Sequence, residues 1–85
     1  MQINFHKNFI KQYDKLSTKL KNKYDERLEV FKENPFAPEL NNHSLHGEYL
    51  GYRSINITGD LRAINKIKED CTYFVIIDTH SNLYK

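Results

Sequence analysis

The sequence contains few of the residues that cross-link or interrupt a fold. Its 85 residues include one cysteine, two prolines, three glycines and no tryptophan. The single cysteine, Cys71, excludes an internal disulfide bond. No apolar run is long enough to span a membrane, and the first residues do not resemble a secretion signal. The sequence therefore predicts a cytoplasmic protein that does not associate with membranes.

The length and composition predict one folded domain over residues 1–85. A chain of this size can form one modest hydrophobic core but not two. Hydrophobic residues make up 39% of the sequence, including six tyrosines and five phenylalanines, which can bury much surface. There is no internal repeat and no low-complexity segment. This composition favours a folded chain over a disordered one.

The charges are unevenly distributed along the chain. Residues 1–24 carry six lysines and one aspartate, whereas residues 25–48 carry two basic and six acidic residues. Lysines gathered at one end can bind phosphate groups of a nucleic acid. The alternative is a solvated helix face without a ligand, which is what lysines alone more often form.

The first half of the chain predicts a strand followed by two helices. Residues 2–6 alternate polar and apolar, which is typical of a short strand at a sheet edge or parallel to another strand. From Lys7 onward, apolar residues recur at helical spacing. The chain is expected to break near Ser17, which can cap a second helix that ends at Asn34–Pro35. The helical apolar positions are Phe9, Tyr13, Leu16, Leu20, Tyr24, Leu28 and Phe31.

The second half predicts a loop followed by three strands. Two prolines between residues 35 and 38 indicate a connecting loop that continues to about residue 44. Strands are expected over residues 52–58 and 61–67, joined by a turn at residues 58–60, and over the apolar run 72–78, which belongs in a sheet centre. The predicted fold is α+β: a short N-terminal strand, a two-helix hairpin, and a three-stranded antiparallel meander covered on one face by the helices.

The predicted hairpin gathers polar side chains. Ile55 and Ile57 alternate with Ser54 and Asn56, which predicts one buried and one exposed face. A site is expected at the open face and mouth of the hairpin, formed by Asn56, Asp60, Arg62, Asn65 and Lys66. Further along, His80 and Tyr84 share a face only if the tail, residues 79–85, is helical.

Three segments carry a resemblance to a known family. HSLHGEYLGYR (residues 43–53), INITGDLRAI (55–64) and IDTHSNLY (77–84) resemble the RelE/YafQ superfamily of bacterial toxins, most closely its YafQ branch. The resemblance implies a RelE-like fold and a toxin of a type II toxin-antitoxin system. Such a toxin is a ribosome-dependent endoribonuclease that cuts mRNA in the A site without a metal or other cofactor. The implied partners are a protein antitoxin, the ribosome and mRNA, and the toxin alone is expected to be a monomer.

The chemistry of RNA cleavage can be matched to side chains. It requires a base to activate a 2'-hydroxyl, an acid for the leaving oxygen, and positive charge near the phosphate. By resemblance, the catalytic residues are His43, Asp60, His80 and Tyr84, with Asp60 as base or orienting group and His80 as acid. The residues expected to contact RNA are Lys7, Lys11, Lys15, Lys19, Arg53, Arg62 and Lys66.

Structural roles remain open as alternatives for these residues. His43 can bond only to the backbone, Asp60 can satisfy its own turn, and Tyr84 can hold the tail on the core. Arg53 can pair with a carboxylate inside the fold. His43 and His46 have no third ligand at a spacing typical of a metal site, so no metal is expected.

Two departures from the YafQ pattern favour a second hypothesis. Asn56 stands where that branch tends to carry histidine, and an amide cannot transfer a proton at neutral pH. Asn65 stands where a tyrosine is usual. The alternative function is therefore an attenuated or non-cleaving protein of the RelE/ParE fold that binds an antitoxin or gyrase.

Overall fold

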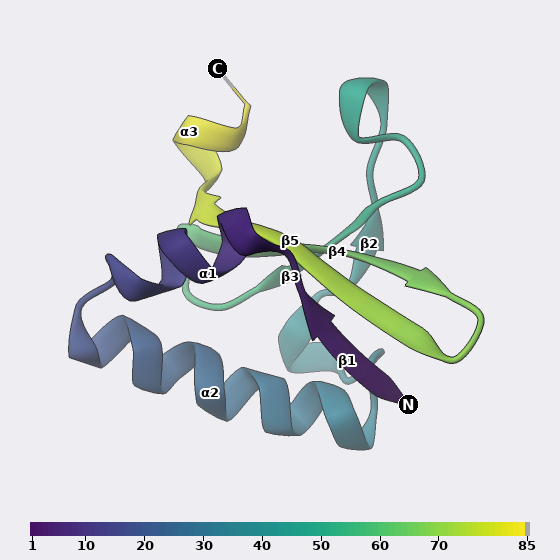
Figure 1. Ribbon diagram of the computed structural model, residues 1–85, viewed down its shortest axis with the longest axis horizontal. Coiled ribbons are helices and arrows are strands. Elements are labelled where there is room, and N and C mark those ends of the chain that lie inside the picture. The colour runs from purple at the N-terminus through teal and green to yellow at the C-terminus, as the bar shows by residue number, and fades with distance from the viewer. Residues whose placement is uncertain (85) are drawn as a thin grey trace.

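The computed structural model describes residues 1–84 and contains a five-stranded sheet with the order β1-β5-β4-β3-β2 (Figure 1). Strand β1 is parallel to β5, and the other neighbours are antiparallel. The elements, in chain order, are β1 (Gln2–Phe5), α1 (Lys7–Asp14), α2 (Thr18–Glu33), the 3-10 turn η1 (Pro38–Leu40), β2 (His43–Ser44), the 3-10 turn η2 (Gly47–Tyr49), β3 (Arg53–Asn56), β4 (Leu61–Lys68), β5 (Cys71–Thr79) and α3 (His80–Leu83).

The helical hairpin has the predicted break, and both helices begin at side-chain caps. The His6 ring accepts a hydrogen bond from the N–H of Asn8, and the Ser17 hydroxyl accepts one from the N–H of Leu20. Each cap satisfies a backbone donor that has no partner inside its helix. Helix α2 ends at Glu33, and Asn34 after it has extended backbone, because the following proline disfavours helical backbone in the residue before it.

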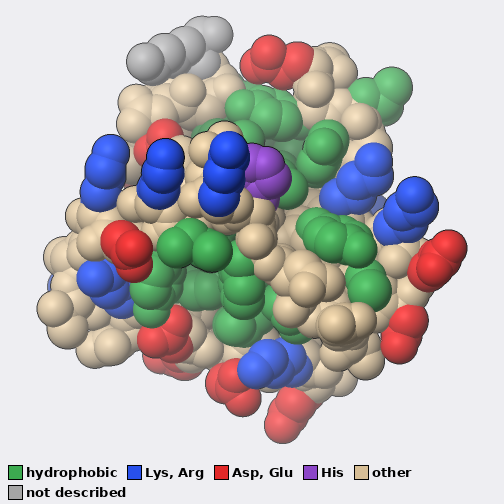
Figure 2. Space-filling view, viewed as in Figure 1, with side chains coloured by type: hydrophobic (Ala, Val, Ile, Leu, Met, Phe, Trp, Pro, Cys, Tyr) green, Lys and Arg blue, Asp and Glu red, His purple; other side chains and the backbone are tan. Residues whose placement is uncertain are grey.

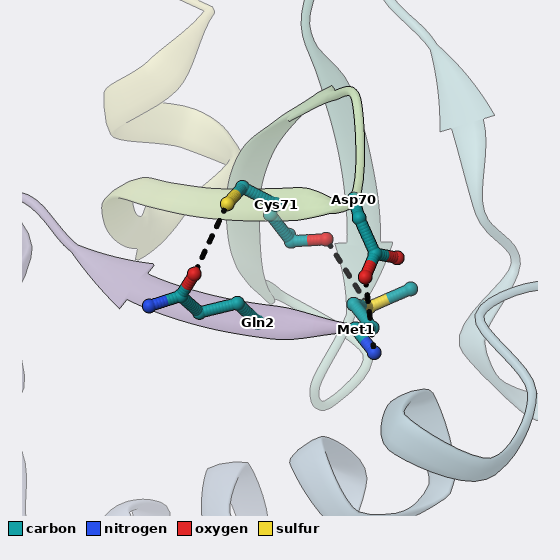
Figure 3. A network of polar contacts seen from close by, with 5 residues as sticks. Met1, Gln2, Asp70 and Cys71 are labelled. Carbon is teal, nitrogen blue, oxygen red and sulfur yellow. Dashed lines mark hydrogen bonds and ion pairs between the residues drawn. The ribbon is translucent and has the colours of Figure 1, made fainter.

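Contacts at the N-terminus hold β1 against β5 at the sheet edge (Figure 3). The N–H of Gln2 donates to the carbonyl of Asp70 at 2.9 Å, and the Cys71 thiol donates to the Gln2 side chain at 3.4 Å. The Met1 ammonium lies 3.9 Å from the Asp70 carboxylate, whose side chain is 93% exposed, so this ion pair contributes little. The strand pairing therefore places α1, which follows β1 directly, over the sheet.

The sheet buries side chains on both faces. The face under α1 and α2 carries the larger core, which contains Phe9, Tyr24, Phe31, Ala37, Leu40, Ile55, Ile57, Leu61, Ala63, Phe74 and Ile77. The opposite face carries a smaller cluster of Leu45, Ile64 and Leu83. In Figure 1, α3 and the segment between β2 and β3 both project from this second side. A cleft between them is described below.

Two predictions about the sheet are incomplete or wrong. The predicted three-strand meander is present, but β2 adds a further strand at the edge, paired with β3. Its two residues are too few to show alternation in the sequence. Alternation predicts Ser54 on an exposed face, but it is only 1% exposed, because it lies at the bottom of a cleft between the 41–46 segment and α3.

Tyr24 gives the fold a sensitivity to alkali. Its side chain is 2% exposed and its hydroxyl has no hydrogen-bond partner within residues 1–84. Burial, and then the nearby Asp25 carboxylate, raise the pKa of Tyr24 above its ordinary value. The native state therefore holds this proton more tightly than the unfolded chain, so the free energy of unfolding falls as the pH rises above about 10.

We expect Tyr24→Phe to remove this dependence. The slope of unfolding free energy against pH should become shallower by up to about 1.4 kcal/mol per pH unit above pH ~10. Urea unfolding of both proteins between about pH 9 and about pH 11 measures the difference. Parallel pH profiles for the two proteins would show that Tyr24 ionises equally in the native and unfolded states.

Candidate active site

A cleft of about 480 Å³ opens on the sheet face opposite α1 and α2. Its floor comes from Ser54 and Asn56 of β3 and Arg62 of β4, which alternate with Ile55, Leu61 and Ala63 of the helix-facing core. One wall is the segment Asn41–His46, and the other is formed by His80 and Tyr84. Five of the side chains predicted for the site therefore meet here: His43, Asn56, Arg62, His80 and Tyr84.

His43 is held in the cleft by the short strand β2. It lies opposite Ser54 in the β2-β3 pairing, so both side chains are on the cleft face. Its Nδ1 is 2.8 Å from the carbonyl oxygen of Asn41. Since a carbonyl only accepts, Nδ1 carries the hydrogen and Nε2 of the neutral ring is the free acceptor. The geometry leaves His43 able to take up a proton at Nε2.

His80 is the first residue of α3, so the tail has the helical form that His80 and Tyr84 need in order to share a face. The N–H of His80 donates to the carbonyl of Asp60 at 2.8 Å, and Thr79 caps the helix by accepting from Asn82 at 3.2 Å. The ring centroids of His80 and Tyr84 are 4.8 Å apart, as expected for residues four apart on a helix. Lys85, the last residue of the predicted tail, lies outside the described residues.

Asp60 is next to this site, but its carboxylate does not line the cleft. The residue is exposed, and its backbone makes the relevant contacts. Its N–H donates to the Thr58 hydroxyl at 3.3 Å, and its carbonyl receives the N–H of His80. Asp60 therefore fixes the position of His80 through the main chain.

Arg62 brings positive charge into the cleft. Its Nη1 donates to the carbonyl of Thr58 at 2.9 Å and to that of Leu61 at 3.4 Å, which anchors one end of the guanidinium. Among the described residues it forms no ion pair. Its remaining N–H groups can bind a phosphate.

The other predicted RNA contacts lie outside the cleft. Arg53 donates through Nε to Asn42 at 2.7 Å and stacks over Phe36 at 5.2 Å, so it has an internal role. Lys66 lies over the ring of Tyr52, with 5.4 Å from Nζ to the centroid. The four N-terminal lysines are exposed on α1 and the start of α2. Figure 2 shows a row of basic side chains over α1.

The sequence interpretation did not identify every residue that lines the cleft. His46 lines the cleft, whereas its sequence context suggests only a comparison with metal ligands. Ser54 Oγ and Asn56 Oδ1 are buried atoms without a hydrogen-bond partner in the described chain, and both residues form the cleft floor. No group of three or more His, Cys, Asp or Glu within residues 1–84 is arranged to hold a metal ion.

Asn65 is not part of the site, contrary to the sequence prediction. It lies opposite Arg53 and Phe74 in the sheet pairings, and Phe74 belongs to the helix-facing core. Alternation along β4 places Asn65 with Leu61 and Ala63, away from Arg62. The side chain is 0% exposed, and neither amide atom has a partner within the described residues.

We expect Asn65→Leu to stabilise the protein. A buried amide without a hydrogen bond costs about 1–3 kcal/mol, so the free energy of unfolding should rise by up to that amount. Chemical denaturation of the parent and the variant measures the change. Asn65→Asp is the matched control and should destabilise, because it buries a carboxylate. A lower stability for Asn65→Leu would mean that the amide is satisfied in solution.

Comparisons with known proteins agree with this architecture. The model of the family described as "Bacterial toxin of type II toxin-antitoxin system, YafQ" matches residues 1–85. The chain is similar to YafQ from Escherichia coli BL21(DE3), with 24% identity, a TM-score of 0.82, and coverage of 99% of this chain and 98% of that one. No curated protein sequence matches the chain.

Two further solved structures share the fold. The E. coli DinJ-YafQ toxin-antitoxin complex contains a chain with 26% identity and a TM-score of 0.74, with coverage of 99% of this chain and 97% of that one. A YoeB/ParE toxin from Agrobacterium tumefaciens has 19% identity and a TM-score of 0.80, with coverage of 94% and 99%. In the part of the chain that the structure describes, no helix is long and apolar enough to cross a membrane.

Proposed function

Because the chain belongs to the YafQ family of bacterial toxins of type II toxin-antitoxin systems, we propose that it is an endoribonuclease that cuts mRNA in the ribosomal A site. The observation that carries this proposal is the cleft that His43, His80 and Arg62 share. RNA cleavage without a metal requires a base, an acid and positive charge near the phosphate, and two imidazoles and a guanidinium can fill these roles.

The side chains can be assigned to the steps of a transesterification. Nε2 of His43 removes the proton of the 2'-hydroxyl, whose oxygen attacks the adjacent phosphorus. Arg62 stabilises the negative charge that develops on the phosphoryl oxygens. The bond from phosphorus to the 5'-oxygen then breaks, and His80 donates a proton to that oxygen. The products are a 2',3'-cyclic phosphate and a 5'-hydroxyl.

Asp60 and Tyr84 have supporting roles in this scheme. We assign the base to His43 rather than to Asp60, because the Asp60 carboxylate does not line the cleft. Asp60 is a positioning residue that acts through its backbone contact with His80. Tyr84 is 42% exposed beside His80, so its ring can stack on a base of the message.

The N-terminal lysines are proposed to contact ribosomal RNA. Changing Lys11, Lys15 and Lys19 to glutamine should weaken ribosome binding and reduce the slope of log affinity against log salt by about one unit for each lost phosphate contact. Binding measured over a series of salt concentrations tests this. Lys32→Gln is the control, since Lys32 pairs with Glu29 at the other end of α2. An unchanged slope in the triple variant would exclude the lysines from the interface.

A protein antitoxin is the proposed partner of this toxin. The support is the family, together with solved complexes of YafQ with DinJ. The cytoplasm is the expected compartment, because the proposed substrate is mRNA on ribosomes. The free toxin is expected to be a monomer.

The test is induced expression of the toxin followed by mapping of mRNA 5' ends. Discrete cuts at codon positions of translated messages, absent with a His80→Gln variant, are the expected result. Growth arrest with intact messages would favour the alternative, a non-cleaving protein that binds gyrase. Asn56 is the feature on the cleft floor that favours this alternative, because its amide cannot transfer a proton.

A further inference from the structure

A second groove lies on the same sheet face as the cleft and is not used by the chemistry above. It has a volume of about 300 Å³ and runs between the start of α1, turn η2 and strand β5. Its lining residues are His6, Asn8, Glu48, Tyr49, Tyr52, Val75 and Ile76. Most of this lining is aromatic or aliphatic, and Glu48 is its single carboxylate.

A contact between two tyrosine rings joins the lining of the groove to that of the cleft. Tyr49 lines the groove, Tyr84 lines the cleft, and their ring centroids are 6.2 Å apart with an edge-on angle of 80°. An RNA strand whose cleaved linkage lies beside His80 therefore has a continuous aromatic path from Tyr84 to Tyr49. Successive bases of a single strand bind to such rings by stacking.

Basic side chains lie beside this path. Lys66 is 5.4 Å from the centroid of the Tyr52 ring, and Lys7, next to His6, is exposed. In Figure 2, hydrophobic side chains lie next to the end of the row of basic side chains. Aromatic rings combined with lysines are typical of surfaces that bind single-stranded nucleic acid.

The two tyrosine hydroxyls of the groove are available to a ligand. Neither the Tyr49 nor the Tyr52 hydroxyl hydrogen-bonds to another of the described residues. Burial, and then the adjacent Glu48 carboxylate, raise the pKa of Tyr49, so its hydroxyl remains a hydrogen-bond donor. The groove thus offers flat apolar surface with polar edges, which matches a nucleobase.

We propose that this groove is a second nucleotide subsite, in which Tyr49 stacks on the base of the nucleotide next to the cleaved linkage. The inference rests on the proposed RNA cleavage and adds a residue that positions the substrate. Stacking on an aromatic side chain is worth about 1–3 kcal/mol per base, which corresponds to about 5- to 150-fold in rate or affinity.

The test is a double-mutant cycle on programmed ribosomes. One partner is Tyr49→Leu, with Tyr49→Phe as the matched control that keeps the ring. The other is an mRNA with an abasic nucleotide directly 5' or directly 3' of the cleaved linkage. With the parent protein and Tyr49→Phe, one of these abasic messages should be cut about 5- to 150-fold more slowly than the intact message. Tyr49→Leu should cut the intact message and this abasic message at the same rate. That rate should be lower than the rate of the parent protein on the intact message.

Different results separate this inference from the proposed function. The abasic penalty is the factor by which the abasic message is cut more slowly than the intact one. If Tyr49→Leu cuts the intact message and shows the same abasic penalty as the parent, the subsite is overturned and the proposed nuclease activity stands. If no variant cuts any message, both proposals fail. Weaker binding of an antitoxin to Tyr49→Leu, with the abasic penalty unchanged, would make the groove a protein-binding surface instead.

A cross-linking experiment tests the subsite without a substitution in the protein. The message carries 4-thiouridine next to the cleaved linkage. The nucleotide that would supply the attacking 2'-hydroxyl is replaced by its 2'-deoxy form, which blocks the reaction. Irradiation of the ribosome complex should cross-link the thiouridine to the peptide that contains Tyr49 and Tyr52. Cross-links confined to other segments of the toxin would overturn the proposal.

Discussion

Replacing His80 by glutamine is expected to lower the rate of mRNA cleavage on programmed ribosomes by about 10²- to 10⁴-fold, the usual contribution of one positioned proton-transfer group. His80 is placed in the cleft by its backbone bond to Asp60 and by the Thr79 cap. Glutamine keeps a polar side chain on α3 but cannot protonate the leaving oxygen. Single-turnover cleavage of a message with one A-site codon measures the effect.

Two variants sharpen this result. Asp60→Asn keeps the carbonyl that binds His80, so its loss of rate should be well below that of His80→Gln. Asn56→His adds an imidazole to the cleft floor and should increase the rate. Unchanged cleavage by His80→Gln, in a protein that unfolds at the same temperature as the parent, would remove His80 from the mechanism.

Phe74→Ala should have the largest effect on stability. The Phe74 side chain is 0% exposed, and its ring centroid lies 5.4–6.0 Å from those of four other aromatic residues on β1, α1 and α2. Truncation of a buried phenylalanine costs about 3–5 kcal/mol. Native proteins have only about 5–15 kcal/mol in total, so the variant should lose a large fraction of the free energy of unfolding.

The neighbouring residue provides the control for this prediction. Tyr73 is in the same strand but faces the other way and is 41% exposed, so Tyr73→Ala should cost about 1 kcal/mol or less. The midpoints of urea unfolding compare the two variants directly. Similar midpoints would mean that the two helices do not depend on Phe74 for their attachment to the sheet.

The order of the elements could be predicted from the sequence, because the features that specify it are local. Apolar spacing distinguishes α1 and α2 from the strands, Ser17 marks the break between the helices, and prolines mark the loop. Alternation along β4 also predicts that Asn65 lies on the core face of the sheet. Composition alone groups Asn65 with the other polar residues of the hairpin, whereas the strand period places it on the opposite face from Arg62.

Only the tertiary structure decided which residues form the cleft. The sequence by itself determined the α+β order and, through its motifs, His43, Arg62, His80 and Tyr84 as candidates. Their meeting depends on pairings between distant segments: β2 with β3 places His43, and the bond from His80 to Asp60 places α3 across from it. Such contacts leave no periodic pattern in the chain, so neither the exclusion of the Asp60 carboxylate nor the groove beside Tyr49 could be predicted from it.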